Sequence, residues 1–288
     1  MTATTLRTAL VIGCGTAGTS VALALTGAGV DVALLDEDPQ ALAEAVALGA
    51  GTGWTPRRPP AGIVVIATPP SAVAAAVHDA QSRGLGYVYT DLAGTKEIVC
   101  AEAELRGCDL KGYVPGHPLI GPGATGRAAD AGRFAGRPWV LCPYDTTPGW
   151  ALETAAALIE LCGAHRLDLA PHVHDEVVAV GSHLPYLVAA VLSAGLAESR
   201  PEAVALAGGE VAADLGAAGA DPVLGGELLA QNAGPLADAL DRTVRELSAA
   251  ARMLHTGEDT LPVQLTLLLE RGRRSLAAIE AAAANTAH

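Results

Sequence analysis

Three glycines placed directly after a short apolar run do most to restrict what this chain can fold into. The run Thr8–Ile12 is followed by Gly13-Cys-Gly15-Thr-Ala-Gly18, and an apolar, alanine-containing stretch begins at Thr19. This order of strand, glycine-rich turn and helix is typical of the first βαβ unit of a dinucleotide-binding domain. Gly13 would permit the tight turn, Gly15 would let a pyrophosphate approach the backbone, and Gly18 would let the helix pack on the strand.

An acidic residue at a suitable distance strengthens this prediction. Asp36 follows a second apolar run, Val32–Leu35, and lies 18 residues after Gly18, where a carboxylate can accept hydrogen bonds from a ribose diol. Backbone N–H groups at the start of the helix, at Thr16 and Ala17, would meet the phosphates. Two more acids follow Asp36, and three carboxylates would repel the 2′-phosphate of NADP. We therefore expect NAD as the cofactor.

The change in sequence pattern along the 288-residue chain predicts two domains. Up to about residue 170, β-branched runs alternate with alanine-rich helical stretches, and beyond it only helical spacing remains. We expect an α/β fold, with a Rossmann-type doubly wound parallel sheet over residues 1–170 followed by an all-α domain over residues 171–288. The expected strands are Thr8–Ile12, Val32–Leu35, Ile63–Ala67, Tyr87–Asp91, Gly112–Val114, Pro138–Cys142 and His165–Leu169. Thr68 and Pro69, after the third strand, would line the cofactor cleft.

Composition excludes several classes of partner. The formal net charge is −13 and aromatic residues make up 3% of the chain, so we expect no nucleic acid to bind. The uncharged stretch Thr8–Val30 is long enough to span a bilayer, but its glycines make it a poor span, and we expect no membrane segment. Five cysteines without a CxxC pair are typical of reduced thiols, which predicts a cytoplasmic protein.

Two histidines are candidates for chemistry. His117 lies in Gly116-His117-Pro118-Leu119-Ile120-Gly121, which we expect to form a rigid loop after a strand, and His183 lies in the helical half. Hydride transfer usually needs a base, and a neutral imidazole can serve. A cluster of His172, His174 and Asp175 resembles a metal site, but positions two apart do not share a helix face, so we expect no metal.

The ordered series of motifs resembles the prephenate/arogenate dehydrogenase family over nearly the whole chain. The matching segments are the glycine turn, Ile66-Ala67-Thr68-Pro69-Pro70, Thr90-Asp91 with Lys96, Gly116–Gly121, Gly136–Pro143, His174-Asp175-Glu176, Ser182-His183-Leu184-Pro185, Asp221-Pro222 and Asn232. The resemblance implies NAD-dependent oxidative decarboxylation of a cyclohexadienyl acid. It makes His117 the base that takes the proton of the ring 4-hydroxyl, and His183 a ligand of a substrate carboxylate.

The chain departs from the family pattern at four positions. Gly94 stands where a serine usually assists the histidine, with Thr95 beside it as a possible hydroxyl, and Gly123 replaces a frequent glutamate. Leu215 replaces an arginine that would clamp the ring carboxylate, and Tyr186 replaces a second histidine near the substrate. Arg127 and Arg133 are candidate replacements for the missing arginine, since a carboxylate favours a guanidinium partner.

Three alternatives stay open from the sequence. The same chemistry could act on 4-amino-4-deoxyprephenate, which fits the missing serine. The β-hydroxyacid dehydrogenase and imine reductase group shares the domain order, but its lysine-dependent members need a lysine that this chain lacks after Lys111. A non-catalytic nucleotide-sensing relative would bind the cofactor without turnover. The apolar helical stretches Leu224–Asn232 and Leu261–Leu269 also predict a homodimer formed through the helical domain.

Overall fold

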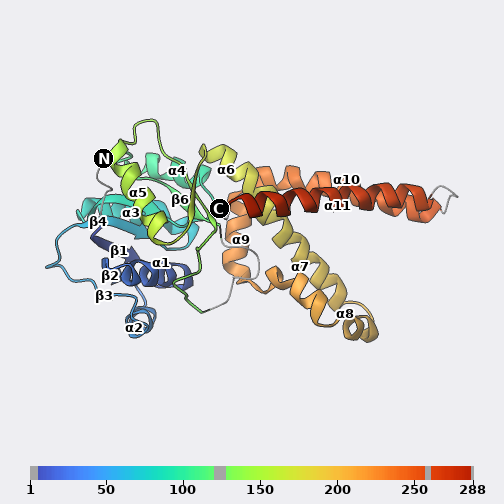
Figure 1. Cartoon of the computed structure of the whole chain (residues 1–288), viewed down its shortest axis with the longest axis horizontal. Coiled ribbons are helices and arrows are strands. Elements are labelled where there is room, and N and C mark those ends of the chain that lie inside the picture. The colour runs from blue at the N-terminus through green and yellow to red at the C-terminus, as the bar shows by residue number, and fades with distance from the viewer. Residues whose placement is uncertain (1–5, 120–127, 257–260, 287–288) are drawn as a thin grey trace.

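A five-stranded parallel sheet forms the centre of the N-terminal half, in the order β3-β2-β1-β4-β5 (Figure 1). The computed structural model describes residues 6–119, 128–256 and 261–286. The strands are β1 (Thr8–Ile12), β2 (Asp31–Leu35), β3 (Thr52–Gly53), β4 (Ala61–Ile66) and β5 (Gly86–Asp91). This sheet and the helical half that follows it confirm the predicted fold class. The pattern missed β3, because a two-residue strand carries no periodicity.

Helices cover both faces of this sheet, and alternate strand residues enter two separate cores. On one face, β1 and β4 contribute Val11 and Ile63 to a core shared with helices α1 (Thr16–Gly27) and α5 (Gly149–Leu161). On the other, Leu10 and Val64 pack with helices α3 (Val73–Ser82) and α4 (Glu97–Leu105). Helix α2 (Pro39–Ala47) is capped by Asp38, whose side chain accepts a hydrogen bond from Gln40 N.

A second, three-stranded sheet lies beside the first and was not expected. Strand β6 (Gly116–Pro118) is antiparallel to β7 (Pro138–Leu141), which is parallel to β8 (His165–Asp168). The predicted strand Gly112–Val114 is wrong, because only Tyr113 forms a bridge there, to Tyr89. Pro115 has no N–H to continue the ladder, and the chain pairs next with β7. His117 therefore lies in a strand and not in the loop that we expected.

The helical half contains no strand among its described residues. Its elements are α6 (Pro171–Val178), a π-helical turn (Ala179–His183), α7 (Leu184–Ala197), α8 (Pro201–Asp214), a 3₁₀ turn (Gly216–Gly219), α9 (Pro222–Gln231), α10 (Ala233–Thr256) and α11 (Leu261–Thr286). Helices α10 and α11 run side by side and project away from the sheet (Figure 1). The backbone of α8 kinks at Gly208, which has a φ of 60°.

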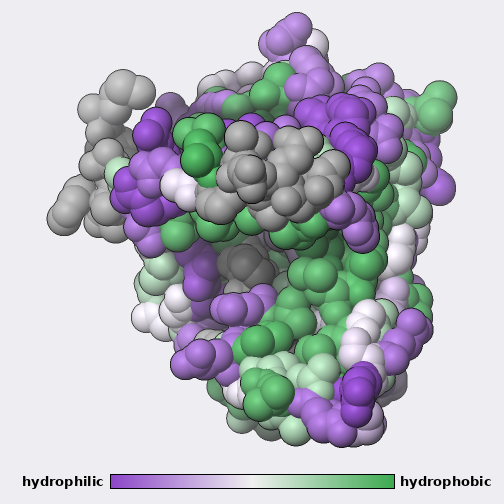
Figure 2. Space-filling view, turned by 90° about the vertical axis from the view of Figure 1, so that its right-hand side faces the viewer, coloured by the Kyte–Doolittle hydropathy of each residue, from purple (hydrophilic) through white to green (hydrophobic). Residues whose placement is uncertain are grey.

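Large apolar side chains remain exposed on these helices. Seen from the helical end, hydrophobic residues gather around a hollow in the surface (Figure 2). The most exposed include Val191, Leu206, Leu247, Leu267, Leu269 and Ile279. The stretch Pro171–Ala197 is long and apolar enough to cross a membrane by length and composition alone. That stretch also carries buried His174, Asp175 and His183.

Candidate active site

The glycine turn between β1 and α1 has the geometry of a phosphate cradle. Gly13 has a φ of +103°, and a Cβ there would lie 2.5 Å from the carbonyl oxygen of Ala67. A Cβ on Gly18 would lie 2.0 Å from the carbonyl oxygen of Gly13, so the helix can approach the turn only with glycine at this position. Around Gly15 the space is open, and among the described residues no side chain caps α1. The helix N-terminus is thus available to an anion.

Asp36 and Thr68 flank this turn. The Asp36 carboxylate accepts hydrogen bonds from Cys14 N (2.5 Å) and Asp38 N (2.8 Å), which hold it beside the turn at the end of β2. The hydroxyl oxygen of Thr68 is buried and has no hydrogen-bond partner among the described residues. An open helix N-terminus, an oriented carboxylate and an unsatisfied hydroxyl fit the phosphates, ribose and neighbouring groups of NAD.

Replacing Gly18 with alanine is expected to weaken NAD binding at least tenfold and to lower the free energy of unfolding by about 1–3 kcal/mol, because the new Cβ collides with backbone. Gly27→Ala, at the other end of α1, is the matched control because a Cβ there meets nothing within 4 Å. Titration calorimetry and urea unfolding measure the two effects. Equal NAD affinity in Gly18→Ala and the control would contradict the role given to Gly18.

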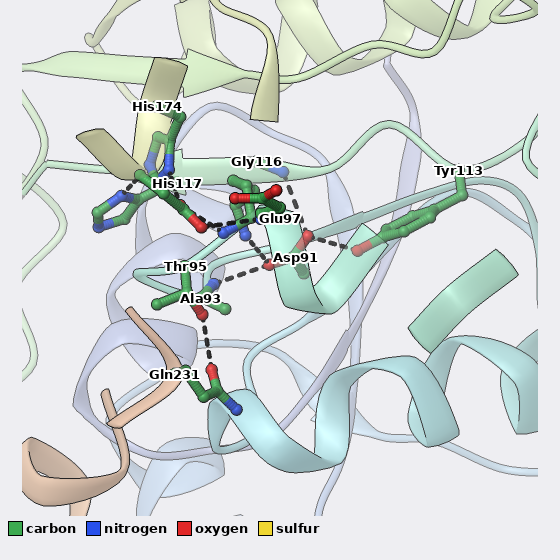
Figure 3. A network of polar contacts seen from close by, with 11 residues as sticks. Asp91, Ala93, Thr95, Glu97, Tyr113, Gly116, His117, His174 and Gln231 are labelled. Carbon is green, nitrogen blue, oxygen red and sulfur yellow. Dashed lines mark hydrogen bonds and ion pairs between the residues drawn. The ribbon is translucent and has the colours of Figure 1, made fainter. Parts of the chain in front are cut away.

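Asp91, at the end of β5, is the centre of a hydrogen-bond network next to His117 (Figure 3). Its carboxylate accepts hydrogen bonds from Lys96 Nζ (2.6 Å), Tyr113 Oη (2.7 Å), Ala93 N (2.8 Å) and Gly116 N (3.2 Å). Asp91 and Lys96 are both 0% exposed. These bonds link β5 to the start of α4 and to β6, so they fix where the neighbouring His117 is held.

His117 belongs to a chain of three polar side chains. Its Nδ1 lies 2.8 Å from His174 Nε2, and His174 Nδ1 lies 2.7 Å from Asp175 Oδ1. Asp175 also accepts hydrogen bonds from Lys96 N (2.8 Å) and Glu97 N (2.9 Å). The chain joins β6 to α6 and to the beginning of α4 (Figure 3). Both ring nitrogens of His174 are thereby occupied by side chains, which leaves neither free for a metal.

His183 is held from the helical side. It is 1% exposed and lies in the π-helical turn, with its Nδ1 3.0 Å from Asn232 Nδ2. Asn232 Nδ2 also donates to the carbonyl oxygen of Asp175 at 2.8 Å, which identifies this atom as the amide nitrogen. His183 Nδ1 must then be the acceptor, and its Nε2 carries the proton. A neutral His183 can therefore donate a hydrogen bond to an anionic ligand.

Burial keeps both histidines neutral. Burial lowers the pKa of His117 well below 6.5, and the nearby His174, Lys96 and His183 lower it further. Burial also lowers the pKa of His183, to about 4, although the Asp175 carboxylate opposes this shift. At neutral pH His117 can therefore act as a proton acceptor, as general-base catalysis requires.

These lowered pKa values predict a loss of stability in acid. An unfolded histidine binds a proton near pH 6.5 and the folded one does not, so stability is present above pH 6.5 and falls as the pH falls below it. For His183, whose folded pKa is about 4, we expect a loss of about 2 kcal/mol at pH 5. Urea unfolding at several pH values measures it, and His183→Gln should flatten the slope. The exposed His172→Gln should not; an equal slope in both variants would contradict the assignment.

The remaining predicted site residues have varied surroundings. The Thr95 hydroxyl donates to Gln231 Oε1 at 2.6 Å, and not to His117 (Figure 3). Tyr186 packs against α9, because a Cβ on Gly225 would meet its hydroxyl at 2.1 Å. Arg133 is half-buried in the turn before β7. Arg127 and Gly123 lie outside the described residues.

Sequence reasoning gave no role to four residues that the structure brings to this site. His174 and Asp175 were considered as metal ligands and as part of a segment that resembles the family, and neither was given a role beside His117. Gln231 and Leu228 lie on α9 and reach the residues around His117 only through the packing of α9 on the first domain. A Cβ on Gly94 would lie 2.6 Å from Leu228 Cδ1, so this leucine fills the space beside the glycine.

Comparisons with known proteins identify relatives that match most of the chain. Residues 21–167 match the family model of the prephenate dehydrogenase nucleotide-binding domain, and residues 170–266 match that of the prephenate dehydrogenase dimerization domain. "Probable prephenate dehydrogenase NovF" of Streptomyces niveus is 38% identical over 86% of this chain and 69% of its own. Prephenate dehydrogenase of Bacillus subtilis (strain 168) is 28% identical over 83% of this chain and 68% of its own.

A solved structure extends the likeness to the fold. Prephenate dehydrogenase from Aquifex aeolicus, in complex with hydroxyphenyl propionate and NAD+, has a TM-score of 0.80. It is 21% identical, and the match covers 95% of this chain and 99% of that one. Both halves of the chain therefore have counterparts in a single solved molecule.

Proposed function

The chain belongs to the prephenate dehydrogenase family, and we propose that it catalyses the NAD-dependent oxidative decarboxylation of prephenate or arogenate. The observation that carries this proposal is the contact of His117 Nδ1 with His174 Nε2, which leaves Nε2 as the ring nitrogen of a neutral His117 that can face a substrate. His183 supplies the complementary group, an N–H donor for a substrate carboxylate. NAD is supported by the acids at Asp36–Asp38 and by the NAD+ in the Aquifex relative.

In the proposed reaction His117 Nε2 takes the proton of the ring 4-hydroxyl. Bound NAD supplies the acceptor for the hydride that leaves the same ring carbon. Carbon dioxide then departs from the opposite ring carbon, and its bonding electrons complete the aromatic ring. His183 would hold the side-chain carboxylate, while Tyr186 and Arg133 are proposed to complete the substrate pocket. The glycine turn, Thr16, Ala17, Thr68, Pro69 and Asp36 would hold the cofactor against the substrate.

A second substrate is favoured by one specific contact. Leu228 fills the space beside Gly94, where the family resemblance expects a serine hydroxyl next to the histidine. A neutral amine at ring position 4 can support loss of the hydride with its own lone pair, so it needs no hydroxyl beside His117, and the amino analogue 4-amino-4-deoxyprephenate is the alternative substrate. The intact His117, His174 and Asp175 contacts disfavour a non-catalytic nucleotide sensor.

The test of the proposed function is NADH formation by the purified protein with prephenate, arogenate and 4-amino-4-deoxyprephenate offered in parallel. Turnover of prephenate or arogenate with NAD supports the proposal. Turnover of the amino analogue alone would replace it with the alternative. NAD binding without turnover of any of the three would contradict both and favour a sensing role.

We further propose that two copies associate through the helical half. The match to a dimerization domain and the exposed apolar residues of α7, α10 and α11 support this arrangement (Figure 2). A second copy would also cover part of the apolar stretch Pro171–Ala197, which accounts for its composition without a membrane. Light scattering should give twice the chain mass of 28.9 kDa; a monomer at working concentration would contradict the proposal.

We also propose a cytoplasmic location. The five cysteines are buried and free, which supports it.

A further inference from the structure

We propose that His174 and Asp175 are positioning residues that decide which ring nitrogen of His117 carries its proton. The proposal rests on the proposed function, in which His117 is the base. It adds a role for two residues of α6 that do not reach the reacting atoms themselves. Their effect would be to keep Nε2 of His117 unprotonated and aimed at the substrate.

The proposed directions of the hydrogen bonds in the chain start from Asp175. Backbone N–H groups of Lys96 and Glu97 can only donate, and they occupy both carboxylate oxygens. Although burial opposes it, hydrogen bonds from His174 and from these two N–H groups lower the pKa of Asp175. The carboxylate is therefore ionised and accepts only.

Two imidazoles transmit this constraint. Because Asp175 accepts, His174 Nδ1 must carry a proton, and in the proposed chain the other ring nitrogen, His174 Nε2, is the acceptor. His117 Nδ1, 2.8 Å away, must therefore be the donor, which leaves the lone pair on His117 Nε2. The two rings meet edge to face, with centroids 5.0 Å apart and planes at 70°. This orientation suits an N–H of one ring directed at a nitrogen of the other.

On the Nε2 side of His117, Gly94 has no side chain that could hydrogen-bond to the ring. A Cβ added to Gly94 would lie 3.7 Å from His117 Nε2, and the nearest atom to that Cβ is a methyl carbon of Leu228. The nearby Thr95 hydroxyl is engaged by Gln231. The orientation of His117 is thus set from its Nδ1 side, by His174, and not by a hydroxyl at position 94 or 95.

The same chain would stabilise the imidazolium that forms when His117 takes a proton. The charged and titratable groups around His117 are His174 and Asp175 on α6, Lys96 at the start of α4 and His183 in the π-helical turn. Lys96 is paired with Asp91, and His183 is neutral and bonded to Asn232. Asp175 is the carboxylate that can stabilise a new positive charge on His117, because His174 lies between the two and contacts both.

The experiment compares His174→Leu, His174→Gln and Asp175→Asn with the wild-type protein. The matched controls are His172→Leu and Glu176→Gln, which change exposed residues of the same helix. Histidine ¹⁵N NMR of the intact protein reads the protonated ring nitrogen, and the His117→Ala variant assigns its signals. Steady-state kinetics over a range of pH gives kcat and KM separately.

We expect wild-type His117 to carry its proton on Nδ1. His174→Leu should lower kcat about 100-fold with KM nearly unchanged, and His174→Gln should recover part of the loss, because its amide oxygen can still accept from Nδ1. Asp175→Asn should move the acid limb of the kcat profile to lower pH, because the imidazolium loses its counter-charge. Both controls should match the wild type.

A proton on Nε2 of wild-type His117 would overturn the proposal, as would wild-type kcat and pH dependence in His174→Leu. If His174→Leu fails to fold, His174→Gln and the wild-type tautomer still decide the question. Failure of the proposed function would be recognised separately, because the wild-type protein would then turn over none of the three substrates. In that case the NMR measurement still tests the hydrogen-bond chain by itself.

Discussion

His117→Ala is expected to lower kcat by about 10²- to 10⁴-fold while NAD binding stays within about twofold of the wild type. The imidazole is the proton acceptor of the proposed reaction, and alanine offers no replacement. In the proposed function the cofactor is held elsewhere, by the glycine turn and Asp36, so its affinity should not depend on this ring. NADH formation measures the first effect and titration calorimetry the second.

The matched control for this prediction is His165→Ala, which removes an exposed imidazole from strand β8 of the same sheet. It should retain wild-type kcat. Residual turnover in His117→Ala that keeps the wild-type pH dependence would show that another group accepts the proton. Loss of NAD binding together with turnover would point instead to a disturbed fold.

Lys96→Met is expected to lower the free energy of unfolding by about 3–5 kcal/mol. The Lys96 ammonium is the cation bonded to the buried carboxylate of Asp91, and both side chains are fully inaccessible. Removing one charge of a buried pair leaves the other without compensation. Three other donors still reach Asp91, from Ala93, Tyr113 and Gly116, which places the expected loss toward the lower end. Urea unfolding measures it.

The chain contains one other lysine, Lys111, which is exposed. Lys111→Met should therefore leave the free energy of unfolding within about 0.5 kcal/mol of the wild type. Adding Asp91→Asn to Lys96→Met should restore part of the loss, because the unpaired buried charge disappears. An equal loss in Lys96→Met and Lys111→Met would mean that the buried pair contributes nothing particular.

Several elements were predictable because their signals are local. The strand at Thr8–Ile12, the turn at Gly13 and the helix after it all follow from residues that are neighbours in the sequence. Asp36 could be placed as well, because the end of the second strand is a fixed number of residues from the turn. The two-sided burial of the parallel sheet likewise appears as continuous apolar runs.

The strand that carries His117 was not predictable in the same way. Strand β6 has three residues, one of them proline, and it exists because β7 supplies an antiparallel partner about 20 residues later. Pairing over that distance leaves no periodic mark in so short a segment. The sequence therefore predicted a loop at Gly116-His117-Pro118, whereas the structure pairs these residues with β7.

The sequence by itself determined the dinucleotide-binding unit, the fold class and the choice of His117 and His183 as candidate residues, because strand, turn and residue type are encoded within short windows. Only the tertiary structure decided what surrounds those histidines. His117, His174 and Asp175 meet because α6 docks on β6 and α4, and Leu228 and Gln231 arrive from α9. Contacts between segments far apart in the chain depend on the packing of whole elements, and no local pattern records them.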